Sequence, residues 1–202
     1  MASASPRRLQ LLRSLGLDVE VVPTDYAEVS PPGASPADLA SYHAAAKLRA
    51  ALEKRSNGDD TPVVAADTVV DLDGVALGKP CDAGEAMRML QRLSGRDHFV
   101  HTAFALAAAH GSSWTERATT RVRFYPLTAE EIAEYVASGE PFDKAGAYGI
   151  QGRAASLIEE IGGDFYTVMG LPMARLIRAL RRLGFTLPDT NEPTQGRAPN
   201  HR

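Results

Sequence analysis

The pattern of apolar and polar positions predicts a chain in which helices and strands alternate. Several amphipathic runs with helical periodicity follow a Ser, Thr or Asp, residue types that favour the start of a helix. Runs of small and β-branched apolar residues, typical of strands, lie between them. The predicted helices run from Ser5 to Gly16, Ser35 to Lys54, Asp82 to Gly95, Thr128 to Gly139 and Pro172 to Leu183. The predicted strands are Val63 to Val70, His98 to Ala107, Thr115 to Tyr125 and Ser156 to Ile161.

Turn and tail signals complete this outline. Asp73-Gly74 follows the first strand and predicts a hairpin turn, and the polar segment 55–60 predicts a loop. Residues 186–202 are rich in Pro, Asn, Thr and Gly without apolar periodicity, which predicts a disordered tail. Residues 1–185 are then expected to form a single α/β domain. In its last helix the residues expected to face inward are Leu176, Ile177, Leu180 and Leu183.

Composition narrows the functional classes. The net charge of −3 argues against a broad nucleic-acid-binding surface, so any anion site must be local. The single cysteine, Cys81, excludes an internal disulfide and a multi-cysteine metal site, and it fits a reducing cytoplasm. The N-terminus has arginines and no apolar signal-peptide core, and no run of about 18 apolar residues exists. We therefore expect neither a secretion signal nor a membrane span, and a cytoplasmic location.

The opening Ser3-Ala4-Ser5-Pro6-Arg7-Arg8 places two arginines at the start of the first helix. A helix N-terminus carries partial positive charge and free N–H groups, so cations there are unfavourable unless an anion binds. Serine hydroxyls, free amides and two guanidinium groups together suit a phosphate. The alternative interpretation, of equal weight for this hexapeptide alone, is a solvated basic start to a helix.

Asp67 stands out because it interrupts an apolar strand, Val63 to Val70. An unpaired carboxylate in such surroundings is energetically costly, so it needs a cation, a metal or several hydrogen-bond donors. A carboxylate facing a cleft is a common metal ligand or general base. The competing interpretation is an Asp at a strand end, satisfied by backbone amides.

Two lysines, one acid and two glycine-rich segments are further candidates. Lys79 lies between Gly78 and Pro80 shortly after the predicted hairpin, and Lys47 lies on the second helix. Glu28 is an acid in a predicted loop and is uninformative alone, just as a lone lysine is usually a solvated surface residue. The segments 143–152 and 162–172 are dense in glycine and small residues, which indicates either a backbone close to a ligand or tight turns.

In this order along the chain, these pieces resemble the Maf family of nucleotide pyrophosphatases. The resemblance extends from Ala2 to about Phe185. Each motif is weak alone, but together and in register they are highly specific. The matching motifs are Ser3-Ala4-Ser5-Pro6-Arg7-Arg8, Lys47, Ala66-Asp67-Thr68, Gly78-Lys79-Pro80, Ser94-Gly95-Arg96, Asp143 to Gly152 and Gly170-Leu171-Pro172.

The resemblance implies a two-lobed α/β fold of the Maf/Ham1-like (ITPase-like) type, with an elongated mixed sheet flanked by helices and a central cleft. It also implies a homodimer and hydrolysis between the α and β phosphates of a nucleoside triphosphate, assisted by a divalent cation, Mg²⁺ or Mn²⁺. Carried over by position, Asp67 is the catalytic carboxylate, as base or metal ligand, and Glu28 is a metal-site acid. The implied phosphate contacts are Ser3, Arg8, Lys47 and Lys79.

Three positions resemble the branch of the family that acts on dTTP and UTP. These are Arg7 after Pro6, Thr68 after Asp67, and Gln151. The other well-known branch acts on 7-methyl-GTP and tends to carry an aromatic residue, Gln and Glu there. Gln151 suits a pyrimidine, because its amide pairs with both a donor and an acceptor on a uracil or thymine edge. The implied role is sanitation of the nucleotide pool, with a link to septum formation and arrest of cell division.

Other functions remain as alternatives. One is a pyrophosphatase for 7-methyl-GTP or another modified nucleotide, and another is a non-catalytic nucleotide-binding regulator of division. A nucleic-acid binder that uses Arg7, Arg8 and the arginines of the last helix is disfavoured by the acidic balance and the 6% aromatic content. One departure from the family is expected to matter. Its members usually have a short apolar strand before the Ser-x-Ser-Pro-Arg-Arg segment, whereas only Met1 and Ala2 precede it here.

Overall fold

The computed structural model describes residues 1–3, 5–55, 61–108 and 113–188. Its centre is a five-stranded sheet with the strand order β2-β1-β3-β4-β5, in which every neighbouring pair is antiparallel. The only parallel contact among the described residues is an isolated bridge between Ala2 and Ala65. The strands are β1 (Val63–Leu72), β2 (Val75–Leu77), β3 (Asp97–Ala107), β4 (Ser113–Phe124) and β5 (Ile158–Gly162).

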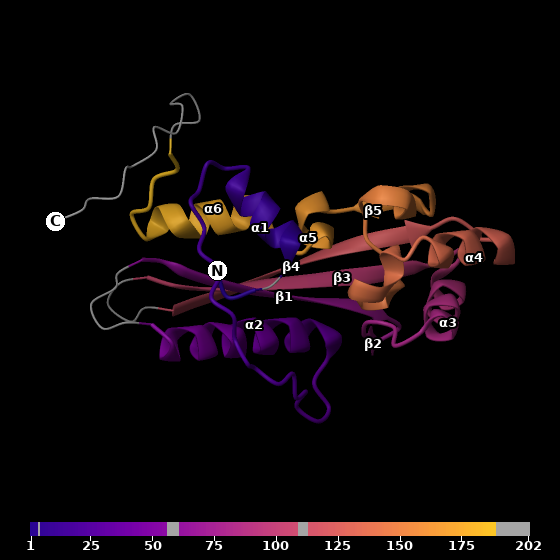
Figure 1. Cartoon of the computed structure of the whole chain (residues 1–202), viewed down its shortest axis with the longest axis horizontal. Coiled ribbons are helices and arrows are strands. Elements are labelled where there is room, and N and C mark those ends of the chain that lie inside the picture. Colours follow the sequence, from indigo (N-terminus) through magenta and orange to yellow (C-terminus); the bar gives the residue numbers. More distant parts are fainter. Residues whose placement is uncertain (4, 56–60, 109–112, 189–202) are drawn as a thin grey trace.

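Helices cover both faces of this sheet, which confirms the predicted α/β class with an elongated sheet flanked by helices (Figure 1). Helix α2 runs along one face, α1, α5 and α6 lie on the opposite face, and α3 and α4 lie at the far end. The α-helices are α1 (Pro6–Arg13), α2 (Pro36–Glu53), α3 (Ala83–Leu93), α4 (Ala129–Ala137), α5 (Phe165–Met169) and α6 (Met173–Arg182). The short 3₁₀ helices are η2 (Glu140–Asp143), η3 (Ala145–Ala147) and η4 (Gly152–Ser156).

The polar residues that predicted the helix starts form the expected caps at three helices. The side chain of Ser35 accepts a hydrogen bond from the backbone of Asp38, and Thr128 forms a complete capping box with Glu131. Asp82 caps α3 in the same way as Ser35 caps α2. Helix α1 differs, because the Ser5 side chain makes no capping hydrogen bond. Its first turn therefore keeps backbone N–H groups that Ser5 does not satisfy.

Apolar side chains form clusters at the two ends of the sheet, and these ends correspond to the two predicted lobes. At one end α3 and α4 pack on the sheet through residues that include Leu90, Ile132 and Phe124. At the other end α1 and α6 cover one face and α2 covers the opposite face. Small residues let α2 approach the sheet closely, namely Ala40 and Ala44 on the helix and Ala65, Ala103 and Ala105 on the strands.

The N-terminal strand that was expected to be nearly absent is reduced to three hydrogen bonds, one of them from the Met1 amino group to the Glu20 carbonyl. Ala2 donates its N–H to the carbonyl of Val64 at 2.8 Å, and the Met1 carbonyl accepts from Val22 at 3.0 Å. Ala2 is buried, so this short contact still fixes the start of the chain against β1. The segment that leads into α1 is therefore attached to the start of β1, where the short strand β2 does not reach.

Several details differ from the sequence prediction. The last strand is Ile158–Gly162 and is preceded by the 3₁₀ helix η4, while α5 and β2 are too short for periodicity to reveal. The prediction that Leu183 faces inward is wrong, because it caps the C-terminus of α6 and is 39% exposed. Residues 56–60 of the predicted loop 55–60, and residues 189–202 of the predicted tail 186–202, lie outside the described residues. Among the described helices, none is long and apolar enough to cross a membrane.

A buried histidine gives the fold a predicted pH dependence. His98 is buried beside Phe124 and lies 2.6 Å from the Tyr148 hydroxyl through Nε2. Burial lowers the pKa of His98 to about 4, from an ordinary value of 6.5. A histidine with a lowered pKa stabilises the fold above pH 6.5, and this contribution is lost as pH falls towards 4.

We therefore expect the free energy of unfolding of the wild type to fall by about 2 kcal/mol more than that of His98→Gln between pH 7 and pH 4.5. Glutamine keeps a hydrogen-bonding group near Tyr148 but does not titrate. Urea unfolding of both proteins at the two pH values measures the difference. Equal losses in both proteins would show that His98 is not the titrating group.

Candidate active site

All the residues predicted from the sequence for the site line one cleft of about 780 Å³. Its walls are the N-terminal segment with α1, residues 23–30, α2, β1, and the loops 76–79, 143–151 and 168–170. A volume of this size is within the range of small-molecule sites, about 300–1,000 Å³. The predicted residues that it brings together are Ser3, Arg7, Arg8, Glu28, Lys47, Asp67, Thr68, Lys79 and Gln151.

The cleft is locally positive although the chain as a whole carries a net charge of −3. Five cationic side chains line it, namely Arg7, Arg8, Lys47, Lys79 and Lys144. Three carboxylates share the same walls, namely Glu28, Asp67 and Asp143. A concave surface with two surplus positive charges concentrates an anionic ligand. If the chain has a local anion site, this cleft is where its charge favours one.

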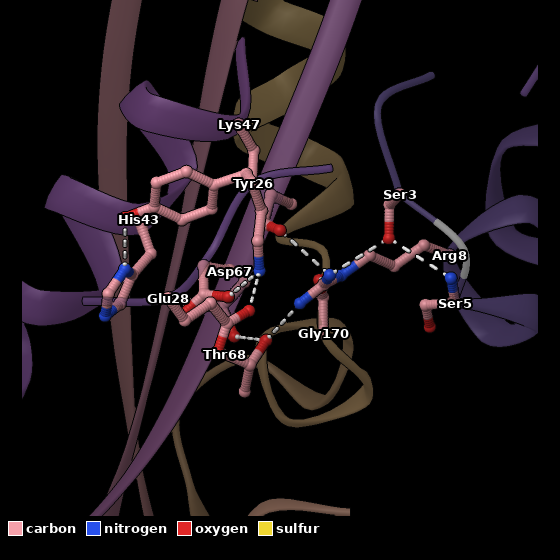
Figure 2. Close-up of polar contacts among 12 residues, drawn as sticks. Ser3, Ser5, Arg8, Tyr26, Glu28, His43, Lys47, Asp67, Thr68 and Gly170 are labelled. Atoms are coloured by element: carbon pink, nitrogen blue, oxygen red, sulfur yellow. Dashed lines mark hydrogen bonds and ion pairs between the residues drawn. The ribbon is translucent and has the colours of Figure 1, made fainter. Parts of the chain in front are cut away.

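Lys47 lies at the centre of the acidic part of the cleft (Figure 2). Its ammonium group is 2.6 Å from Asp67 Oδ1 and 2.5 Å from Glu28 Oε1. Asp67 is buried in the middle of β1 and paired with a lysine, so it is not a strand-end Asp satisfied by backbone amides. Helix α2 and strand β1 thus bring together two groups that are 20 residues apart in the sequence.

The Lys47 ammonium also controls the charge of Glu28. Partial burial alone would raise the pKa of Glu28, but the hydrogen bond and positive charge of Lys47 outweigh burial and lower it. The more distant charge of Lys79 acts in the same direction. Glu28 is therefore ionised at neutral pH and can bind a cation.

The two carboxylates fit a divalent metal that is shared with a ligand. Glu28 and Asp67 converge on one cationic group, the Lys47 ammonium, and carboxylate oxygens are the protein ligands that Mg²⁺ and Mn²⁺ prefer. Among the described residues, no group of three or more His, Cys, Asp or Glu side chains is placed to hold a metal. The described chain therefore offers two carboxylate ligands to such an ion, fewer than the roughly six that it usually takes.

Arg8 is buried and engaged with the protein. Its guanidinium donates to the carbonyls of Gly170 at 2.7 Å and Ala66 at 2.8 Å, and also to the hydroxyls of Thr68 and Ser3. These contacts join α1 to β1 and to the turn between α5 and α6 (Figure 2). Arg8 therefore ties three walls of the cleft together.

The Thr68 hydroxyl belongs to a directional chain of hydrogen bonds. Thr102 donates to the carbonyl of Thr167 at 2.7 Å, which uses its only hydroxyl hydrogen. Thr68, 2.9 Å from Thr102, must then donate to it, and it accepts from Arg8 at 2.8 Å. In this chain, which joins α1, β1 and β3, Arg8 and Thr102 are buried and Thr68 is half-buried. The side chain of Thr68 is consequently fixed in orientation.

Arg7 points to the other side of the cleft from Arg8. Its guanidinium is 3.1 Å from Asp143, which also pairs with Lys144. The side chain of Lys144 lies against Gly149, where an added Cβ would stand 2.7 Å from two Lys144 carbons. A side chain at residue 149 would therefore require the end of Lys144 to shift from its place beside Asp143. Arg7 is 30% exposed and, unlike Arg8, lies at the cleft surface.

Lys79 and Gln151 lie on the exposed rim of the cleft. The loop of Lys79 is fixed to the glycine-rich segment by a 2.9 Å hydrogen bond from Gly146 N–H to the Gly78 carbonyl. Among the described residues, neither side chain makes a hydrogen bond, so both can contact a ligand. The glycine-rich segment 143–152 thus lines the cleft, and positive φ at Gly146 and Gly152 shows that it also contains tight turns.

Sequence reasoning missed several residues of the cleft. Tyr26 and His43 lie beside Glu28 and Lys47, and Thr102 supports Thr68 from β3. His43 stands four residues before Lys47, which places both on one face of α2 and was a signal that could have been used. Thr102 in an apolar strand was a similar signal, because a buried hydroxyl needs a partner.

Comparison with known proteins shows the family of the chain. The family model described as "Maf-like protein" matches residues 1–183. The chain belongs to the Maf family. A Maf relative from Symbiobacterium thermophilum, named dTTP/UTP pyrophosphatase, is 46% identical over 187 residues, which are 93% of this chain and 94% of the relative. Relatives of the same name from Bacillus cytotoxicus and Geobacter metallireducens are 45% and 44% identical, covering 90% and 91% of this chain and 93% and 95% of their own.

Solved structures of similar proteins include a nucleoside-triphosphatase, also named dITP/XTP pyrophosphatase, from Mycobacterium abscessus. It is 18% identical, with a TM-score of 0.40 and coverage of 90% of this chain and 94% of its own. A HAM1 protein from Coxiella burnetii is 15% identical, with a TM-score of 0.47 and coverage of 89% and 96%. Membership of the Maf family rests on the family model and on the sequence relatives.

Proposed function

We propose that this Maf protein hydrolyses dTTP and UTP to the monophosphate and diphosphate, and so removes these or modified pyrimidine nucleotides from the pool. The observation that carries the proposal is the Glu28–Lys47–Asp67 cluster inside a locally positive cleft. The relatives above, which carry the name dTTP/UTP pyrophosphatase, support the same substrates. The proposal includes a homodimer and a cytoplasmic location, as the family resemblance implies.

The reaction needs water to attack the α-phosphorus while the bond to the bridging oxygen breaks and diphosphate leaves. Asp67 is suited to take a proton from the water, because it is buried in the cleft and its Oδ2 makes no hydrogen bond to a described residue. Negative charge builds on the phosphate oxygens, so the main catalytic task is electrostatic stabilisation. Lys47, Lys79 and Arg7 supply positive charge around the cleft.

Glu28 and Asp67 are the residues that would hold a divalent cation, Mg²⁺ or Mn²⁺. When bound, such an ion neutralises phosphate charge and makes water more acidic. Since the described residues supply two carboxylates, we propose that the ion binds together with the nucleotide.

Ser3 and the start of α1 are proposed to receive the phosphates. Ser3 Oγ accepts from the Ser5 N–H and from Arg8, so its own hydrogen is available for a ligand. Ser5 leaves the first-turn N–H groups of α1 uncapped, and such groups favour anions. Arg8 is proposed to hold the walls of this phosphate site in position, because its guanidinium already donates to Gly170, Ala66 and Thr68.

Base selection is assigned to Arg7, Thr68 and Gln151. Gln151 is exposed on the cleft rim, where its amide can donate to and accept from a uracil or thymine edge. Thr68 is proposed to shape the base site with a side chain of fixed orientation, because Arg8 and Thr102 hold its hydroxyl. The charge of Arg7 can turn from Asp143 to the ligand.

The change Gln151→Glu is expected to lower kcat/KM for UTP and dTTP by about tenfold or more, because a carboxylate cannot donate to a base carbonyl. The ratio of kcat/KM for UTP to that for 7-methyl-GTP measures the change in preference. Gln151→Ala is the matched control, since it removes the contact without adding charge. If the ratio stays the same in Gln151→Glu, Gln151 does not select the base.

The proposed function is tested by diphosphate release from a panel of canonical and modified triphosphates with Mg²⁺ or Mn²⁺. We expect dTTP and UTP to be the best substrates. A preference for 7-methyl-GTP would instead place the chain with the other branch of the family. Tight nucleotide binding without diphosphate release would identify a non-catalytic regulator.

A further inference from the structure

The loop that carries Glu28 is held in place by side chains. Among the described residues, the backbone of residues 26–30 makes one hydrogen bond, from Val29 to Ala27 within the loop itself. Val29 is 70% exposed, so no apolar anchor buries the tip of the loop. A segment with so few backbone bonds and buried contacts moves readily unless side chains restrain it.

His43 supplies this restraint on both sides of Glu28. Its Nδ1 is 2.9 Å from the Tyr26 hydroxyl, and its Nε2 is 3.4 Å from Ser30 Oγ. Tyr26 precedes Glu28 by two residues and Ser30 follows it by two. One imidazole ring therefore holds both arms of the loop, and Figure 2 shows Tyr26 and His43 beside Glu28.

The His43 ring is well placed to act as a fixed anchor. It is buried on α2, with the ring of Tyr42 packed edge-on at 5.5 Å and that of Tyr26 tilted at 5.9 Å. In either neutral tautomer one ring nitrogen donates and the other accepts, and a hydroxyl can match both roles. The anchor therefore works without a charge on the imidazole.

The third contact of the loop is the ion pair between Glu28 and Lys47. In the proposed reaction this contact has to change, because a divalent cation bound by Glu28 and Asp67 repels the Lys47 ammonium. When Lys47 turns away, the hydrogen bonds of Tyr26 and Ser30 to His43 are the remaining restraints on the loop.

We infer that His43 is a positioning residue, which keeps Glu28 facing Asp67 while Lys47 releases the carboxylate to the incoming metal and nucleotide. The inference rests on the proposed function, in which Glu28 binds the cation. It assigns a role to a residue that touches neither the ion nor the nucleotide. Groups of this kind around a metal ligand commonly change metal affinity about 10–100-fold when they are removed.

The double variant Tyr26→Phe/Ser30→Ala tests the inference, because it removes both hydroxyls and leaves α2 unchanged. We expect faster backbone hydrogen exchange in peptides covering residues 24–30. We also expect the Mn²⁺ concentration for half-maximal diphosphate release from UTP to rise about tenfold or more, with a smaller change at saturating Mn²⁺. His43→Ala should move both readouts in the same direction.

Tyr42→Phe is the matched control, since Tyr42 contacts the same ring and makes no hydrogen bond to a described residue. It should keep wild-type exchange and the wild-type Mn²⁺ requirement. Unchanged exchange in the double variant overturns the inference, and so does faster exchange with an unchanged Mn²⁺ requirement. If the wild type releases no diphosphate, the proposed function fails, and calorimetric titration of MnCl₂ replaces the kinetic readout for the same variants.

Discussion

Replacement of Asp67 by asparagine is expected to lower turnover of dTTP and UTP by about 10²–10⁴-fold, the usual contribution of a positioned general base. The side chain keeps its size, and Lys47 keeps Glu28 as a partner, so we expect the fold to survive. Steady-state diphosphate release and thermal unfolding of the same preparation measure both effects.

Asp71→Asn provides a matched control on the same strand. The side chains of Asp67 and Asp71 are 11% and 15% exposed. Asp67 pairs with the Lys47 ammonium, and Asp71 lies beside the imidazole of His101. Asp71 lies outside the cleft, so its variant should retain wild-type turnover. Near wild-type activity in Asp67→Asn would mean that the catalytic carboxylate lies elsewhere.

Replacement of each of the two neighbouring arginines of α1 by methionine is expected to affect the free energy of unfolding very differently. Arg8→Met should lower the free energy of unfolding by about 3 kcal/mol or more, because it leaves the buried carbonyls of Gly170 and Ala66 without donors. Arg7→Met should change stability by about 0.5 kcal/mol or less, as is usual for a surface position. Urea unfolding of the two variants gives the comparison.

For Arg7→Met we expect a catalytic defect without a loss of stability. Arg7→Met is expected to fold normally and to lose about tenfold in kcat/KM for UTP, the value of one charge-assisted contact. Equal destabilisation by both variants would contradict the roles given to the two residues, in which Arg8 stabilises the fold and Arg7 contacts the nucleotide.

Arg8 also shows where sequence reasoning stopped. The helix start and a local anion site could be predicted from Ser5, Pro6 and the two arginines, and the cleft was implied by the family resemblance. The buried face of α1, however, consists of Arg8, Leu11 and Leu12, which have helical spacing. Periodicity assigns a charged residue to the solvent side, so burial of Arg8 became visible only once the carbonyls and hydroxyls around it were placed.

Most of the fold could be predicted because local signals were strong. The caps at Ser35, Asp82 and Thr128 start their helices as expected, and the Asp73-Gly74 hairpin joins β1 to β2 with positive φ at both residues. Strand order and the short helix α5 depend on contacts between distant segments. A single sequence carries no direct record of such contacts.

The residues of the candidate site could also be predicted only in part from the sequence. Chemistry and family resemblance selected Glu28, Lys47 and Asp67, yet the bridging position of Lys47 between the two acids is a property of the folded cleft. His43 carries no motif, and its link to Tyr26 and Ser30 depends on how residues 17–34 fold over α2.

Hydrolysis of UTP in ¹⁸O-enriched water with Mg²⁺ tests the central claim most directly. Mass spectrometry of the products locates the oxygen that water contributes. Attack at the α-phosphorus predicts one ¹⁸O atom in UMP and unlabelled diphosphate. Label in the diphosphate, or release of orthophosphate with UDP, would contradict the proposed reaction.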